Sequence, residues 1–231
     1  CSRVPRANGR VGLGYLLNEN GMIKGEATIA NLPDGRVWYG SAAAAEWHDL
    51  DWLNAHLRED EDVTITSRTN DATILVLAGP NARTVISKVS RADWSQEAMP
   101  WLRVRECFIG IAPAIVMTVS FSGEQAYEIH IPNNQLYAAY LALQAAGATK
   151  LFGARAIDSM RLEKGYLHWK ADILTEFDPF ETGLDRFVKM DKGFIGKAAL
   201  EARLTNRPSR RLVSMVVDST TAPAHPGEPR A

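Results

Sequence analysis

The chain has 231 residues, of which 46% are hydrophobic and 23% charged, and its formal net charge is −1. This length and composition are typical of a globular protein with a real core, in one large or two small domains. The near-neutral charge gives no electrostatic case for binding nucleic acid or an anionic membrane, and no apolar run approaches the roughly 18 residues of a membrane span. The two cysteines provide neither a disulfide framework nor a zinc-binding set.

The first part of the chain alternates strand patterns with helix patterns. After a strand-like segment that is entered by Val11, strands are predicted at 27–32, 36–39, 63–66 and 72–77, the last two as a hairpin. Helices are predicted at 43–57 and from Gly79 to about Val89. The first helix has an apolar stripe formed by Trp47, Leu50, Leu53 and Leu57.

The segment 114–132 is the most informative part of the sequence. Alternation predicts a strand at 114–121, a Ser-Gly turn at 122–123 and a second strand after the turn. The second strand has two faces, one with Tyr127, Ile129 and Ile131 and the other with Ala126, Glu128 and His130. Carboxylates are almost never fully buried without a partner, so Glu128 lies either on the surface or in a polar site.

Two further helices follow, one at 135–146 that stops at Gly147 and one at 156–165 that contains Arg161. A strand carboxylate and a helix guanidinium offer an acceptor and a fork of donors to a flat, polar heterocycle. Strands and helices are mixed without strict βαβ repetition, so the predicted fold class is α+β. Residues 213–217 look like a strand with no later partner, and we expect more protein to follow it naturally.

Several short motifs occur in a set order: Leu17 to Ile23, Leu77 to Arg83, Ser122-Gly123-Glu124 through Tyr127-Glu128-Ile129, Met160 to Gly165, Pro179 to Leu184 and Phe194 to Lys197. In their order and spacing they resemble the glycine-cleavage T-protein (aminomethyltransferase) superfamily, from about Gly9 to Val217. Within it, residues 24–28 and 40–52 look closest to the carboxy-terminal folate part of dimethylglycine and sarcosine dehydrogenases. Six such motifs in order are a far more specific signal than any one of them.

The resemblance implies a T-protein-like folate-binding fold, a cloverleaf of α+β lobes around a tetrahydrofolate site. It divides the chain into a folate-binding aminomethyltransferase-like domain at 1–205, without its amino-terminal part, and the start of an incomplete carboxy-terminal β-barrel domain at 206–231. We therefore expect the chain to be truncated at both ends relative to the family.

The resemblance also implies roles for four residues, and no metal site. Glu128 matches a glutamate that holds the edge of the pterin, and Arg161 matches the arginine of the Arg-Leu-Glu-Lys helix. Tyr127 falls at an aromatic position beside the glutamate, although strand alternation points it to the opposite face. Glu26 stands where the family usually has an aspartate that assists the folate nitrogens, so the implied catalytic residue is Glu26.

The residues leave alternatives open for these roles, and Tyr127 could be a core or rim aromatic instead of a ligand contact. Glu128 could be a solvated residue on an edge strand. Arg161 could pair with Asp158 or Glu163 on the surface of its own helix, which is the usual fate of such charges.

The implied activity is tetrahydrofolate-dependent one-carbon (aminomethyl) transfer. The domain would accept the carbon released from oxidised N-methyl amines such as dimethylglycine or sarcosine and give 5,10-methylenetetrahydrofolate. FAD would be held only by a flavin-dependent oxidising domain on a missing part of the polypeptide or by a partner subunit, because Gly12-Leu13-Gly14 lacks the third glycine of a dinucleotide signature. The compartment implied is the cytoplasm, or the mitochondrial matrix in a eukaryote.

Two alternative functions also follow from the resemblance. One is a non-catalytic folate-binding domain with a regulatory or assembly role, because relatives of the regulatory subunit of pyruvate dehydrogenase phosphatase occur in the superfamily. The other is a folate-dependent demethylase that takes its methyl group from another donor, such as a sulfonium or a methoxy-arene.

Overall fold

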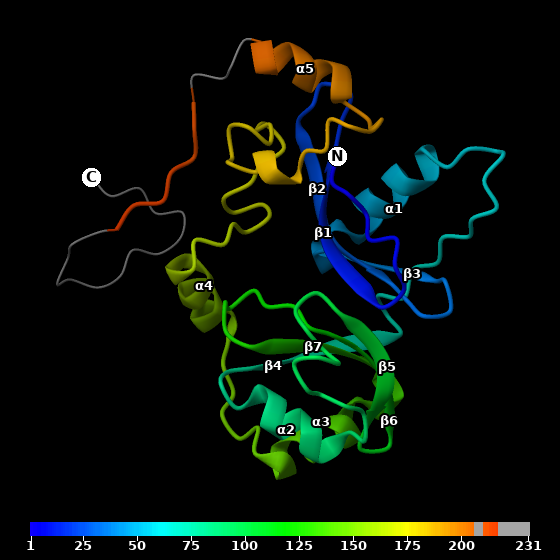
Figure 1. Cartoon of the computed structure of the whole chain (residues 1–231), viewed down its shortest axis with the longest axis vertical. Helices are drawn as coiled ribbons and strands as arrows, with labels where there is room; N and C mark the ends of the chain where they lie inside the picture. The colour runs from blue at the N-terminus through cyan, green and yellow to red at the C-terminus, as the bar shows by residue number, and fades with distance from the viewer. Residues whose placement is uncertain (206–209, 217–231) are drawn as a thin grey trace.

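The computed structural model of the chain describes residues 1–205 and 210–216. Two antiparallel sheets organise this part of the chain (Figure 1). The first sheet, sheet A, has the strand order β1-β2-β3, formed by Arg10–Leu17, Ile23–Asn31 and Val37–Gly40. The second, sheet B, has the order β4-β7-β6-β5, formed by Ala72–Ala78, Ala126–Pro132, Ala112–Met117 and Val104–Ile109.

The helices lie outside the two sheets. They are α1 (Glu46–Ala55), α2 (Ala82–Val89), α3 (Leu136–Ala146), α4 (Ala154–Glu163) and α5 (Lys197–Thr205), with 3-10 turns at Ala43–Ala45, Asn133–Gln135 and Asp185–Phe187. Antiparallel sheets mixed with helices confirm the predicted α+β class. No helix in the described ranges has the length and apolar character that a membrane crossing needs.

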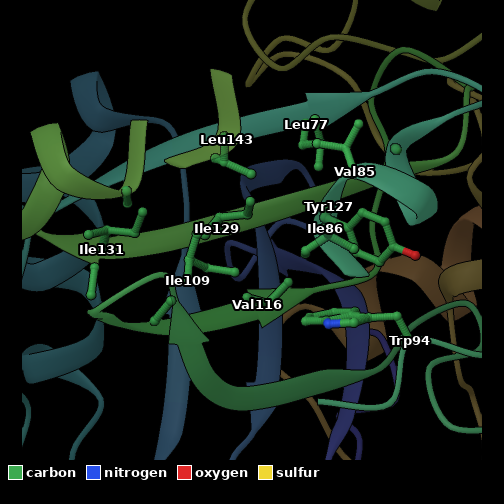
Figure 2. Packing of buried hydrophobic residues seen from close by; sticks show 14 of the residues in the cluster. Leu77, Val85, Ile86, Trp94, Ile109, Val116, Tyr127, Ile129, Ile131 and Leu143 are labelled. Atoms are coloured by element: carbon green, nitrogen blue, oxygen red, sulfur yellow. The ribbon is translucent and has the colours of Figure 1, made fainter. Parts of the chain in front are cut away.

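One face of sheet B carries the largest core, between the sheet and helices α2 and α3 (Figure 2). Tyr127, Ile129 and Ile131 of β7 are completely buried there, with Leu143 of α3 and Ile86 of α2 packed against the same cluster. Fully burying an aliphatic side chain contributes about 1.5–3 kcal/mol, so this face fixes the strand firmly. Because side chains alternate along a strand, the other face of β7 presents Glu128.

That other face of sheet B turns toward sheet A. A second cluster joins the two sheets and contains Val11 and Ala30 of sheet A with Val104 and Met117 of sheet B. Directly opposed residues of an antiparallel pair lie on one face, and Met117 opposes Glu128. In the same way the face with Val11 and Ala30 also carries Tyr15 and Glu26, which oppose each other. Glu26 and Glu128 therefore lie on the surfaces that the two sheets turn toward each other.

A third cluster closes the far end of sheet A. Tyr15, Leu17 and Ile23 pack there against the segment that follows α4, which runs beside β1 and β2 (Figure 1). This segment supplies Trp169, Ile173 and Leu184, and α5 supplies Leu200. Its loops depend on glycines in the left-handed region, among them Gly196 with φ +82°.

We expect Gly196→Ala to destabilise the chain more than Gly183→Ala, although both glycines have positive φ. A β-carbon at Gly196 would lie 2.3 Å from the backbone oxygen of Asn18, whereas one at Gly183 meets nothing within 4 Å. Backbone strain alone costs about 1–2 kcal/mol at either site, and the collision adds about 1–3 kcal/mol at Gly196. Urea unfolding of the two variants measures the difference, and equal losses would contradict the packing at Gly196.

The structure corrects two predictions for the first half of the chain. Residues 63–66 form no strand, and β4 pairs with β7, because Leu75 and Leu77 of β4 align with the buried face of β7. The predicted stripe on the helix at 43–57 is also wrong, since Trp47 is 71% exposed and Asp49 is buried instead. Asp49 is satisfied there because it accepts hydrogen bonds from the Tyr39 hydroxyl (3.1 Å) and the His48 ring (2.9 Å).

Two more differences concern strands. The sequence reading gave no strand at Val104–Ile109, which is β5, because Arg105 and Glu106 interrupt its apolar character. Of the strand predicted at 213–217, residues 213–216 are exposed and form no strand, and Val217 lies outside the described residues. The proposed domain that begins at 206 also falls largely outside them, so that division stays a prediction.

Candidate functional site

Glu128 lies in the middle of β7 with one open side. Its side chain is 28% exposed, and its neighbours across the sheet are Val76 of β4 and Met117 of β6. Val76 is 41% exposed and Met117 is buried, so the carboxylate is open toward β4 and closed toward β6. The position is neither a solvated edge nor a sealed core, because β7 is an inner strand whose Glu128 still reaches solvent.

His130 is the nearest polar neighbour of Glu128 on the same face of β7. Its Nε2 lies 3.8 Å from Oε2 of Glu128, and its Nδ1 accepts a hydrogen bond of 3.3 Å from Nε1 of Trp38 on β3. The His130 side chain is 6% exposed, and Nε2 has no hydrogen-bond partner in the described part of the chain. A residue of sheet A thus reaches across to the strand that carries Glu128.

Arg161 is buried in the last turn of α4, with 1% of its side chain exposed. Its Nε donates to Asp158 (3.3 Å), and its Nη1 donates to Asp172 and to the backbone oxygen of Tyr166 (3.2 Å). The helix-surface pairing with Asp158 is therefore present, together with a longer-range partner. Nη2 is buried without a partner among residues 1–205 and 210–216, so part of the guanidinium fork is unused.

The structure brings the end of α4 against the turn that leads into β7. The aliphatic part of Lys164 lies directly over Gly123, where an added β-carbon would be 2.1 Å from its Cγ. The rings of Phe121 and His168 meet edge to face with centroids 5.6 Å apart. The two segments that the sequence analysis selected, 114–132 and 156–165, are therefore neighbours in space.

Glu26 lies on β2 opposite Tyr15 of β1, on the inward face of sheet A. Burial raises the pKa of the Glu26 carboxyl above its usual value of 4.5, and the hydrogen-bonding Tyr15 hydroxyl offsets this only in part. Burial and the neighbouring Glu26 likewise raise the pKa of the Tyr15 phenol. A carboxyl whose pKa is raised by burial holds a proton more tightly than an exposed carboxyl does.

We expect Glu26→Gln to stabilise the chain at neutral pH. The folded chain holds a proton on Glu26 more tightly than the unfolded chain does, so between pH 4.5 and the raised pKa stability falls as pH rises. Removing that titration should gain about 0.5–2 kcal/mol at pH 7, the usual size of a stabilising change at a functional residue. Thermal unfolding followed by circular dichroism from pH 4 to pH 7 tests this. The gain should shrink toward pH 4, and a lower melting temperature at pH 7 would oppose it.

Tyr127 lies on the opposite face of β7 from Glu128. It is completely buried in the core beneath α2 and α3, edge to face with Trp94 at 5.4 Å (Figure 2). Its hydroxyl has no partner among the described residues. The structure brings Glu128 together with His130 and Trp38 and does not place Tyr127 beside them, so a ligand contact by Tyr127 stays a prediction without geometric support.

A family comparison covers most of the chain. Residues 1–192 match the model of the GCVT N-terminal domain. The chain belongs to this family. Mouse mitochondrial dimethylglycine dehydrogenase is 31% identical over 220 residues, which are 93% of this chain and 25% of that protein. Mouse mitochondrial sarcosine dehydrogenase is 30% identical over 88% of this chain and 24% of its own length.

A solved structure confirms the expected fold of this GCVT domain. The crystal structure of the glycine cleavage system aminomethyltransferase T from Bartonella henselae superposes with a TM-score of 0.78 and 24% identity. The match covers 89% of this chain and 55% of that protein. The chain thus spans about a quarter of the two dehydrogenases and about half of the solved aminomethyltransferase.

The residues of this GCVT domain fit the polar edge of a folate. A pterin presents amino and ring N–H groups that need acceptors, and a carbonyl oxygen that needs a donor. Glu128 supplies a half-exposed acceptor, and Nη2 of Arg161 is a buried donor without a partner in the described ranges. A buried unpaired donor costs about 1–3 kcal/mol, so a ligand oxygen that accepts from Nη2, once the groups that cover this atom move aside, would recover that loss.

A separate groove lies elsewhere in the domain. A groove of about 700 Å³ follows the edge strand β4 and is walled by α3 and by residues 149–157. Its lining is mainly apolar, with Leu77, Leu143 and Phe152 among its residues, and it includes none of Glu26, Glu128 and Arg161. A concave shape does not by itself bind a pterin, which needs several polar groups that point toward it. We therefore place the candidate site at Glu26, Glu128 and Arg161.

Proposed function

We propose that this domain binds tetrahydrofolate and transfers to it the one-carbon unit of an oxidised N-methyl amine, with dimethylglycine and sarcosine as the parent amines. The single observation that best supports the proposal is the placement of Glu26 and Glu128 on the mutually facing surfaces of the two sheets. Two carboxylates in different settings, Glu26 beside Tyr15 and Glu128 beside His130, suit two tasks, one for proton exchange and one for binding a ring.

In the proposed site Glu128 accepts hydrogen bonds from the pterin amino and ring N–H groups, in charge-assisted form. Arg161 donates from Nη2, and its pairs with Asp158 and Asp172 keep the guanidinium in one orientation. In this arrangement Glu128, which is open to solvent, binds the ligand first, and the buried guanidinium of Arg161 orients it.

Glu26 is proposed to handle the proton that the transfer releases. When bound, tetrahydrofolate supplies the two nitrogens between which the carbon is held, and overall an iminium and tetrahydrofolate give the demethylated amine, 5,10-methylenetetrahydrofolate and one proton. A carboxyl with a raised pKa takes up that proton readily and stabilises positive charge at the folate nitrogens. Tyr15, which opposes Glu26 in the pairing of β1 with β2, lies beside this carboxyl.

The oxidation that forms the iminium belongs to another part of the system in this proposal. The two relatives compared above are named dehydrogenases, and this chain matches about a quarter of each. A flavin-dependent oxidising domain or subunit that delivers its product to the folate site is the partner that fits this arrangement. Both relatives are named as mitochondrial, which supports the matrix as the compartment if the source is a eukaryote.

Product analysis tests the proposal in the natural polypeptide that contains this chain. With dimethylglycine or sarcosine and an electron acceptor, added tetrahydrofolate should replace released formaldehyde by 5,10-methylenetetrahydrofolate. Glu26→Ala should lower the yield of that product at least tenfold, because general acid–base groups typically contribute about 10²–10⁴-fold. Glu19→Ala, at an exposed position in the β1–β2 turn, is the matched control. If the amount of formaldehyde released were the same with and without tetrahydrofolate, the proposal would be overturned.

A further inference from the structure

His130 is a buried polar side chain that the proposed reaction does not use. Trp38 donates to its Nδ1 at 3.3 Å, and the two rings meet edge to face with centroids 5.8 Å apart at 88°. An indole N–H can only donate, so Nδ1 of His130 is the acceptor and the ring proton lies on Nε2. The contact therefore fixes the tautomer of the histidine as well as the plane of its ring.

The protonated Nε2 faces the carboxylate of Glu128. The two atoms are 3.8 Å apart, and Nε2 has no other partner among the described residues. A movement of about 1 Å would shorten this contact to a charge-assisted hydrogen bond of ~2.8 Å. Nε2 of His130 is a buried donor without a partner, and the carboxylate of Glu128 beside it is partly exposed. This arrangement is expected if the hydrogen bond between them forms only when Glu128 moves to bind a ligand.

We propose that His130 is a positioning residue for Glu128, held in the required tautomer by Trp38 of the other sheet. This inference rests on the proposed function, because Glu128 needs one orientation only if it binds a ring. Trp38 opposes Ala30 on β2, the strand that also carries Glu26. The Trp38–His130 hydrogen bond thus connects sheet A, which carries Glu26, to β7, which carries Glu128. In this way it sets the spacing between the two carboxylates.

Two substitutions at His130 separate its hydrogen bond with Trp38 from its contact with Glu128. The amide of Gln reaches the position of Nε2 and keeps a donor toward Glu128, whereas the amide of Asn reaches only the position of Nδ1. We expect His130→Gln to bind 5-formyltetrahydrofolate within about threefold of the wild type, and His130→Asn to bind at least about tenfold more weakly. A purely structural role would favour Asn, because Asn preserves the bond from Trp38.

Calorimetric titration of the natural polypeptide measures these affinities, with thermal unfolding of each variant as a check on folding. Trp38→Phe removes the N–H that fixes the tautomer, together with part of the ring, and should weaken binding about three- to tenfold, while Trp47→Phe, the same change on the exposed face of α1, should leave it unchanged. Wild-type binding with equal affinities in the Gln, Asn and Trp38→Phe variants would overturn the role of His130 alone. Absence of wild-type binding would overturn the folate proposal, and the role of His130 with it.

Discussion

Arg161→Met is expected to destabilise the chain by about 3 kcal/mol, at the lower end of the 3–5 kcal/mol typical when one partner of a buried ion pair is removed. The guanidinium is almost completely buried and pairs with both Asp158 and Asp172. Without it two carboxylates remain in a partly buried position with no cation. Both are about a quarter to a third exposed, which is why the expected loss is not larger.

For a chain of this length the loss corresponds to a melting temperature lower by about 6–12 °C. Arg155→Met, at an exposed position of the same helix, is the matched control and should change stability by less than about 0.5 kcal/mol. The loss of stability in Arg161→Lys should fall between those of Arg161→Met and Arg155→Met. An ammonium keeps the charge but lacks the planar set of donors that the guanidinium has. If Arg161→Met unfolded at the wild-type temperature, the buried pairs would contribute nothing and the assigned orientation of Arg161 would be wrong.

Glu128→Ala is expected to weaken the binding of a reduced folate at least tenfold, a loss of about 1.4 kcal/mol or more. The reason is that the pterin N–H groups would leave water and find no acceptor on β7. Because Glu128 is open on its β4 side and lies next to exposed Val76, its removal leaves no core cavity, and folding should be preserved. The measurement is a calorimetric titration of the natural polypeptide with 5-formyltetrahydrofolate.

Glu124→Ala is the control for charge, because Glu124 is exposed in the turn just before β7. It should leave the affinity within about twofold of the wild type, since a solvent-screened carboxylate contributes little at a distance. Equal affinities in the wild type, Glu124→Ala and Glu128→Ala would mean that the folate, if bound, lies away from β7.

The sequence predicted the local features of the site well. The two faces of β7 follow from strict alternation, and the end of α3 follows from Gly147, whose φ of +121° only glycine adopts readily. The resemblance to the T-protein superfamily also named the right family, as the match over residues 1–192 confirms. These features depend on residues close together in the chain, where periodicity and backbone preference act.

Long-range contacts could not be predicted in the same way. The Trp38–His130 bond joins residues 92 positions apart, and nothing in either segment signals the other. The sequence predicted a local hairpin of β4 with residues 63–66, because a neighbouring strand would cover the apolar face of β4. In the structure β4 pairs with β7 instead, whose buried residues lie on the same face. Tyr127 shows the reverse case. Strand alternation correctly pointed its side chain away from the face of Glu128, where it is buried, although its position in the family suggested a ligand contact.

The central claim is that a folate ring lies between the two sheets, in contact with Glu128 and Arg161 and within reach of Glu26. The most direct measurement is a crystal structure of the natural polypeptide with 5-formyltetrahydrofolate. We predict pterin density with its amino edge at Glu128, its carbonyl oxygen toward Nη2 of Arg161, and Nε2 of His130 closer to Glu128 than the present 3.8 Å. Density for the pterin in the groove along β4 and α3 would contradict the account.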